Sequence, residues 1–165
     1  MGSMATKKNM AIIEVLTPPG ETIAAGMASS YNLLLMDSAS EELYLFAVRL
    51  RHEQPSATIE SLECCREASW EADIIVITAS TEQLPAIAEK IREVTTRKPV
   101  IHFTSFEADA GRLQTLLPLA NVIVVVPGHA AQEVGLQQDA CILGNDEEAL
   151  KVTREILAKS FCNVA

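Results

Sequence analysis

Aromatic side chains are scarce in this sequence, since Phe, Tyr and Trp together account for 4% of its 165 residues. Hydrophobic residues nevertheless make up 48% of the chain, so most of them are aliphatic. Parallel strands that are buried on both faces beneath helices have this aliphatic composition. The composition therefore favours an α/β domain over a β-sandwich, and the length fits one domain.

Basic residues are also few, because 13 Lys and Arg stand against 22 Asp and Glu and leave a net charge of -9. An acidic chain without a basic stripe repels phosphate backbones, so we expect no nucleic-acid partner. The sequence lacks an apolar run of the roughly 20 residues that span a membrane. No hydrophobic segment of a secretion signal accompanies the lysines near its start. We therefore expect a cytoplasmic protein without a membrane partner.

Residues 10–165 are expected to form a single domain without an internal linker or repeat. Met1, Gly2 and Ser3 stand ahead of a second methionine, Met4, as the remnant of a cloning tag would. We expect residues 1–9 to comprise this remnant and a disordered N-terminus.

Cysteines and histidines are few, and their spacings match neither a disulfide scaffold nor a metal site. The four cysteines are Cys64, Cys65, Cys141 and Cys162, and the three histidines are His52, His102 and His129. Reduced thiols and no metal are expected. The chain also lacks a G-x-S-x-G elbow, a P-loop and an HExxH motif, so hydrolase and kinase chemistry has no support, and catalytic residues remain unassigned.

Short apolar runs alternate with amphipathic stretches along the chain, which is typical of βαβ units. The predicted strands are residues 10–16, 33–36, 57–59, 74–77, 100–103, 122–126 and 140–143. The predicted helices are residues 21–30, 41–51, 62–70, 84–94, 108–117 and 146–160. Right-handed crossovers then predict an α/β fold, a three-layer doubly wound parallel sheet of the Rossmann type with strand order 3-2-1-4-5-6.

The strands should supply the core, and any ligand should bind where they end. The expected core residues are Ile12, Ile13, Leu34, Ile75, Val76, Ile101, Val124 and Val125. The candidate cofactor-binding residues at the carboxyl edge are Thr17, Gly20, Asp37, Ser38, Thr78, Ser80, Thr104 and His129. Hydroxyl side chains at strand ends also cap the next helix routinely, and that reading of the Ser and Thr residues stays open.

Five stretches, in order, carry a resemblance to one family. They are Gly20-Glu-Thr-Ile-Ala-Ala-Gly26-Met-Ala, Asp37-Ser38, Glu71-Ala-Asp-Ile-Ile-Val-Ile77, Leu117-Pro-Leu-Ala-Asn-Val122 and Gly144-Asn-Asp-Glu-Glu-Ala149. Together they resemble NADP oxidoreductases of the deazaflavin-coenzyme-dependent type and their pyrroline-carboxylate-reductase-like relatives. The resemblance implies a Rossmann domain and makes NAD or NADP the cofactor to test, although the sequence assigns none firmly.

The phosphate-binding loop departs from that family. In the fingerprint G-x-G-x-x-G, the glycine positions match Glu14, Leu16 and Gly20, with one residue inserted between the last two. Leu16 places a branched side chain where a pyrophosphate would approach. Pro18 and Pro19 remove two N–H donors from the helix N-terminus that would hold the anion. The loop therefore predicts impaired or lost dinucleotide binding.

Two carboxylates near this loop have open interpretations. Glu14 would repel each phosphate charge by about 3 kcal/mol at about 5 Å and an effective dielectric constant near 20. Alternatively, Glu14 points into solvent, because side chains alternate faces along a strand. Asp37 is placed to bind the ribose 2′-hydroxyl of NAD and to repel the 2′-phosphate of NADP. Alternatively, it caps the helix that begins near Ser40.

Two functions follow from these features. The first is a degenerate NAD(P)-binding-like Rossmann domain that serves as a regulatory or scaffold domain, with a small molecule or nucleotide as its potential ligand. The second is a weakly nucleotide-binding NAD(P)-dependent oxidoreductase. The relatives implied by the resemblance continue beyond the helix that follows Gly144 into elements of the substrate site. The oxidoreductase would therefore need a partner chain, or a second copy in a homodimer, to complete its active site.

Overall fold

A computed structural model describes residues 6–104, 109–126 and 141–161, and every structural statement below concerns these residues. They contain a seven-stranded sheet with the order β3-β2-β1-β4-β5-β6-β7. The strands are β1 (Asn9–Ile13), β2 (Asn32–Met36), β3 (Ile59–Leu62), β4 (Ile74–Ile77), β5 (Pro99–Phe103), β6 (Asn121–Val126) and β7 (Cys141–Leu143). β1 to β6 are parallel, as predicted, and β7 runs antiparallel to β6.

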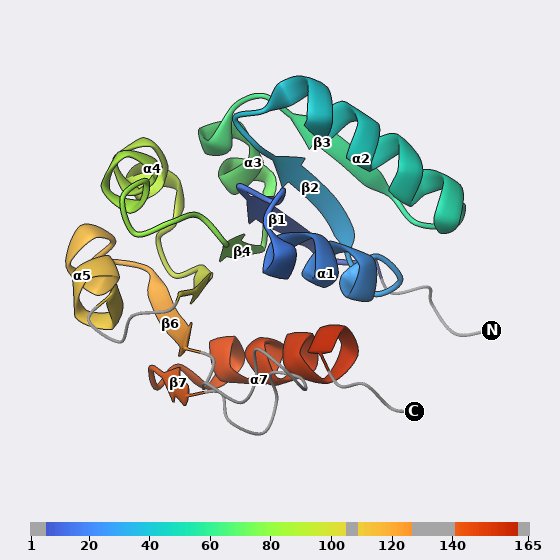
Figure 1. Ribbon diagram of the computed structural model, residues 1–165. Coiled ribbons are helices and arrows are strands. Elements are labelled where there is room, and N and C mark those ends of the chain that lie inside the picture. Colours follow the sequence, from blue (N-terminus) through green and yellow to red (C-terminus); the bar gives the residue numbers. More distant parts are fainter. Residues whose placement is uncertain (1–5, 105–108, 127–140, 162–165) are drawn as a thin grey trace.

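Helices cover both faces of the sheet and make a three-layer domain (Figure 1). One face carries α1 (Pro18–Met27), α2 (Ser40–Glu53) and α7 (Glu147–Ile156). The other carries α3 (Cys65–Glu71), α4 (Leu84–Ile91) and α5 (Asp109–Leu116). A 3-10 turn, η1 (Arg92–Val94), follows α4, and a π-helical turn, η2 (Leu157–Phe161), follows α7. Among these helices, none is long and apolar enough to cross a membrane.

Every expected core residue is buried, and the strands divide them between two layers. Ile12 belongs to the core on the face of α1, α2 and α7, whereas its neighbour Ile13 belongs to the core on the face of α3, α4 and α5. Val124 and Val125 alternate in the same way on β6. This alternation follows from the two-residue period of a strand, and burial on both faces explains the aliphatic composition.

Several predicted boundaries were wrong by a few residues. β1 ends at Ile13 rather than at residue 16, because Glu14 adopts φ = 59° and leaves the extended conformation. α1 therefore begins earlier, at Pro18, where a missing N–H costs nothing. β3 lies at Ile59–Leu62 instead of residues 57–59, so that Leu62 belongs to the strand and not to the following helix.

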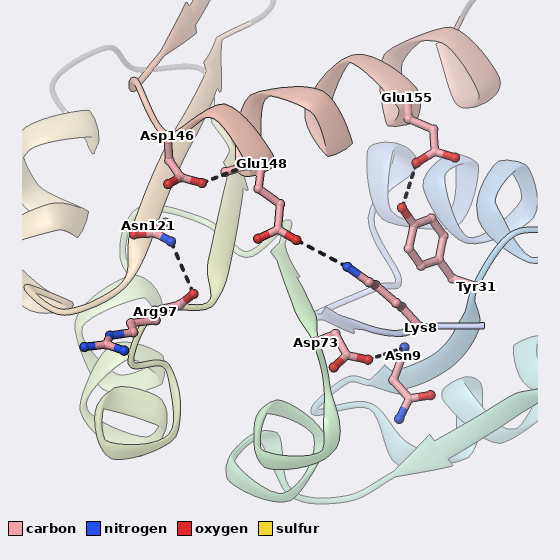
Figure 2. Close-up of polar contacts among 10 residues, drawn as sticks. Lys8, Asn9, Tyr31, Asp73, Arg97, Asn121, Asp146, Glu148 and Glu155 are labelled. Carbon is pink, nitrogen blue, oxygen red and sulfur yellow. Dashed lines mark hydrogen bonds and ion pairs between the residues drawn. The ribbon is translucent and has the colours of Figure 1, made fainter. Parts of the chain in front are cut away.

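Polar contacts hold α7 and the amino ends of the strands together (Figure 2). The Lys8 ammonium lies 3.2 Å from a carboxylate oxygen of Glu148, and the Tyr31 hydroxyl donates to Glu155 at 2.7 Å. The two contacts attach opposite ends of α7 to the segments that enter β1 and β2. Asp146 caps the helix by accepting from the Ala149 N–H at 2.9 Å.

The contact between Tyr31 and Glu155 shifts the pKa values of both groups. Burial, reinforced by the hydrogen bond to Glu155, raises the pKa of the Tyr31 hydroxyl well above its usual value. Burial opposes ionisation of Glu155, but hydrogen bonds from Tyr31 and Lys159 outweigh it and hold the pKa of this carboxyl below its usual range. Folding is therefore favoured by a neutral Tyr31 and an ionised Glu155.

We expect Ile75→Ala to lower the free energy of unfolding by about 2 to 5 kcal/mol, because the fully buried β4 cannot collapse around the cavity. Urea unfolding measures this. Ile142→Ala on the partly exposed edge strand β7 is the matched control and should cost less. A loss below about 1 kcal/mol at Ile75 would contradict its burial.

Tyr31→Phe should cost about 0.5 to 1.5 kcal/mol near neutral pH by removing one hydrogen bond. The stability that Tyr31 adds is present below the unfolded tyrosine pKa of about 10 and is lost above it, because the folded pKa is raised. The stability from Glu155 is present above about pH 4.3 and is lost on further acidification, because its folded pKa is lowered. Urea unfolding of both proteins from pH 3 to 11 tests this, and a pH-independent difference would refute the contact.

Candidate functional site

The sequence-predicted site residues gather at the carboxyl edge of the sheet. Asp37 and Ser38 follow β2, Thr78 follows β4 and Thr104 follows β5. Glu14, immediately after β1, lies between these strand ends, because β1 pairs with both β2 and β4. Parallel strands thus bring residues from four distant parts of the chain to one edge. His129 lies outside the described residues.

Glu14 has a backbone conformation typical of glycine. Its φ of 59° is left-handed, which a side chain disfavours. Two contacts hold the conformation: the Glu14 N–H donates to the Met36 carbonyl at 2.8 Å, and its own carbonyl accepts from Thr78 Oγ1 at 2.8 Å. Contacts from the ends of β2 and β4 therefore hold a left-handed turn at residue 14.

The Glu14 side chain is buried and joins two loops. Its carboxylate accepts from the Ser38 N–H at 2.9 Å, from Ser38 Oγ at 3.0 Å and from Gln83 Nε2 at 3.1 Å. Gln83 Oε1 in turn accepts from both the N–H and the hydroxyl of Ser80 at 3.1 Å. The solvent-facing alternative for Glu14 is wrong, since only 8% of the residue is exposed. A polar bridge instead spans the edge from the loop after β2 to the loop after β4.

Asp37 binds backbone donors with both of its oxygens. One oxygen accepts from the Leu16 N–H and the other from the Ala39 N–H, each at 2.9 Å. The second contact lies just before α2, but the N-cap residue of this helix is Ala39 and no side chain caps it, so the capping interpretation of Asp37 is wrong. The first ties the loop after β1 to the loop after β2.

In the first turn of α1, each residue either lacks a backbone N–H or has its N–H already hydrogen-bonded. Pro18 and Pro19 carry no N–H, and the Gly20 N–H donates to Thr17 Oγ1 at 3.1 Å. The Glu21 N–H donates to the Thr17 carbonyl at 2.9 Å. Thr17 is thus the N-cap of α1, and this turn presents no unbonded N–H to an anion.

Gly20 lies where the structure leaves no room for a side chain. A Cβ at this position would lie 2.3 Å from the Val15 carbonyl oxygen and 2.8 Å from Thr78 Oγ1. Both distances are shorter than real contacts of a Cβ atom, so a side chain would push α1 away from the strands. The described contacts of Gly20 are thus those of a packing residue.

The remaining candidates have local partners. Ser80 bonds to Gln83, and the Thr104 N–H donates to the Val125 carbonyl at 3.0 Å. His102 is buried on β5 with Nε2 3.3 Å from the Ala79 carbonyl oxygen, as expected of a core residue. No cluster of three or more potential metal ligands occurs within the described ranges.

Gln83 is the residue that sequence reasoning missed. The spacing Ser80-x-x-Gln83 fits the capping-box pattern and could have marked it as a bonded side chain. Its contact with Glu14 joins residues 69 positions apart, which no local pattern reveals.

No protein-family model and no curated protein matches this chain. Solved structures do match its fold. A pyrroline-5-carboxylate reductase from Coxiella burnetii aligns over 94% of this chain and 57% of its own, with 11% identity and a TM-score of 0.72. Prephenate dehydrogenase from A. aeolicus, in complex with hydroxyphenyl propionate and NAD+, aligns over 96% and 59%, with 15% identity and a TM-score of 0.72.

An imine reductase from Myxococcus stipitatus, in complex with NADP+, aligns over 90% of this chain and 52% of its own, with 14% identity and a TM-score of 0.71. The chain thus spans somewhat more than half the length of these structures. At such identities the comparison establishes the Rossmann-type fold of the domain. The ligands of these proteins are not assigned to this chain, because function depends on the residues of a site and not on the sheet that carries them.

Replacing Glu14 separates the contribution of its side chain from that of its backbone. Glu14→Ala and Glu14→Gly both remove the carboxylate, but only Gly relieves the left-handed φ. We therefore expect Glu14→Gly to be more stable than Glu14→Ala by about 1 kcal/mol in urea unfolding. Equal stability, or a more stable Ala variant, would mean that residue 14 is not left-handed in solution.

Proposed function

We propose that this chain is a Rossmann-type domain whose dinucleotide site is closed by its own side chains, and that it acts as a regulatory or scaffold domain. The buried Glu14 carboxylate, bonded to Ser38 and Gln83 at the first glycine position, is the observation that supports this most directly. It places a charge and a polar bridge where a dinucleotide would lie.

The residues of this edge do not fit the group that the fold family implies. A pyrophosphate in such a domain is held by N–H groups of the glycine loop and the first helical turn. Here the Leu16 N–H is bonded to Asp37, Pro18 and Pro19 have none, and the Gly20 N–H is bonded to Thr17. An incoming phosphate would meet carboxylates in place of donors.

A ligand that opened this site would have to offset a large unfavourable free energy. A ligand that enters between the two loops must separate Glu14 from Gln83 and displace Ser38. Each hydrogen bond to a charged group contributes about 1.5 to 3 kcal/mol. Repulsion between Glu14 and each phosphate adds about 3 kcal/mol at about 5 Å and a dielectric constant near 20. Together these free-energy costs oppose dinucleotide binding more strongly than the few remaining N–H donors would favour it.

A second candidate function is a weakly nucleotide-binding oxidoreductase. It is favoured by the alignment with NAD+ and NADP+ complexes over nine-tenths or more of this chain and by Gly20 and Asp37 at their family positions. In this alternative NAD or NADP is the cofactor, and a partner chain or a second copy in a homodimer supplies the substrate half. Asp37 would favour NAD over NADP, because its carboxylate opposes a 2′-phosphate.

Calorimetry with NAD and NADP separates the two functions. The native chain should bind either dinucleotide no more tightly than a Kd of about 100 μM. Replacing Glu14 and Leu16 by Gly and deleting Pro19 should improve binding by about 1 to 3 kcal/mol, or about 5- to 150-fold. NAD should gain more than NADP.

Ser80→Ala is the control, because it loses a contact to Gln83 but leaves the glycine positions as they are. It should improve binding less than the repaired loop does. Low-micromolar binding by the native chain would overturn the proposal and favour the oxidoreductase. If the repaired chain unfolds cooperatively in urea yet shows no gain, Glu14 and Leu16 do not occupy the glycine positions.

A further inference from the structure

Helix α2 exposes an unusual amount of apolar surface. Tyr44 is 60% exposed, Leu45 63% and Val48 42%. They are three of the five large hydrophobic residues that are exposed in the described part of the chain, and the other two are Trp70 and Leu119. Tyr44 and Val48 are four residues apart and therefore neighbours on the helix surface. We name Tyr44, Leu45 and Val48 the α2 ridge.

A hollow lies on each side of the α2 ridge. The hollow toward α3, of about 500 Å³, is lined by Tyr44, Leu62 and Cys64 among others. The hollow toward α1, of about 380 Å³, is lined by Leu16 and Leu45 among others. A ridge between two hollows, each lined by apolar and polar side chains, can interlock with side chains of a second surface, as packed helices do.

Acidic residues border the ridge and both hollows. Glu63 and Glu67 line the hollow toward α3, and Glu21 and Glu42 line the hollow toward α1. Of these four glutamates, Glu21 alone has a cationic partner among the described residues. That partner is Arg49, at 3.5 Å, which also lines the hollow toward α1 and lies 5.2 Å from the centre of the Phe46 ring. The surface thus has an apolar centre and a negatively charged rim.

We propose that the α2 ridge and its two hollows bind a partner protein through an amphipathic helix whose apolar face is bordered by Lys or Arg. Interfaces of this kind bury Tyr and Leu anchors at the centre and place complementary charges at the rim. A second copy of this chain is the wrong occupant, because a symmetric contact would place Glu42, Glu63 and Glu67 against like charges. An anionic membrane would be repelled for the same reason. The surface lies outside the Glu14 bridge, so the proposal does not depend on whether a dinucleotide binds.

The test uses the full chain and a fluorescein-labelled model peptide. The peptide is helical, with Leu at positions i, i+3, i+4 and i+7 and Lys beside them, and fluorescence polarisation reports its binding at physiological salt. We expect a Kd below about 100 μM that weakens as salt is raised. Leu45→Glu should weaken binding by at least about tenfold.

Leu119→Glu is the matched control, because Leu119 is 66% exposed and lies away from α2. It should leave the affinity unchanged. Three results would overturn the proposal: no binding of the basic peptide, equal loss in both variants, or equal binding of a peptide with Glu in place of Lys. Dimerisation that Leu45→Glu abolishes, or binding to phosphatidylserine vesicles, would assign the surface to a different occupant. Calorimetry with NAD leaves these outcomes unaffected, so the two proposals fail independently.

Discussion

The left-handed turn at Glu14 is the constraint on which the carboxyl edge depends. The Met36 carbonyl accepts from the N–H groups of both Glu14 and Val15, so the turn is locked to the end of β2. The reversal brings the Val15 carbonyl against Gly20, and only a residue without a Cβ lets α1 begin there. Thr78 closes the arrangement from β4 by donating to the Glu14 carbonyl. Hydrogen bonds from two neighbouring strands and the absence of a Cβ at Gly20 therefore maintain this turn.

The same turn determines what the edge can bind. A carboxylate that projects from residue 14 is buried at 8% exposure, and burial of a charge requires partners. Ser38 and Gln83 supply them, and Asp37 is satisfied in the same way by Leu16 and Ala39. In a dinucleotide-binding domain the donors of this edge are directed at the ligand. In this chain the donors named above bond to two carboxylates of its own sequence.

Much of the fold was predictable because burial follows local periodicity. The alternation of Ile12 and Ile13 between two layers is a property of any strand, and a run of such strands separated by helical patterns implies the parallel order. The site was harder to predict. A left-handed Glu is rare enough that the pattern favoured a strand to residue 16, and the bridge to Gln83 depends on the pairing of β1 with β4. The sequence placed these residues at one edge but did not reveal that they bond to one another.

Asp37 connects the carboxyl edge of the sheet to the segment that leads into α2. Its carboxylate holds the Leu16 N–H of the loop with one oxygen and the Ala39 N–H at the start of α2 with the other. Leu16 also lines the hollow beside the α2 ridge. A ligand that displaced the loop after β1 would therefore have to break the bond between the Leu16 N–H and Asp37. One side chain therefore fixes the loop after β1 and the segment that leads into α2 relative to each other, through a separate oxygen for each.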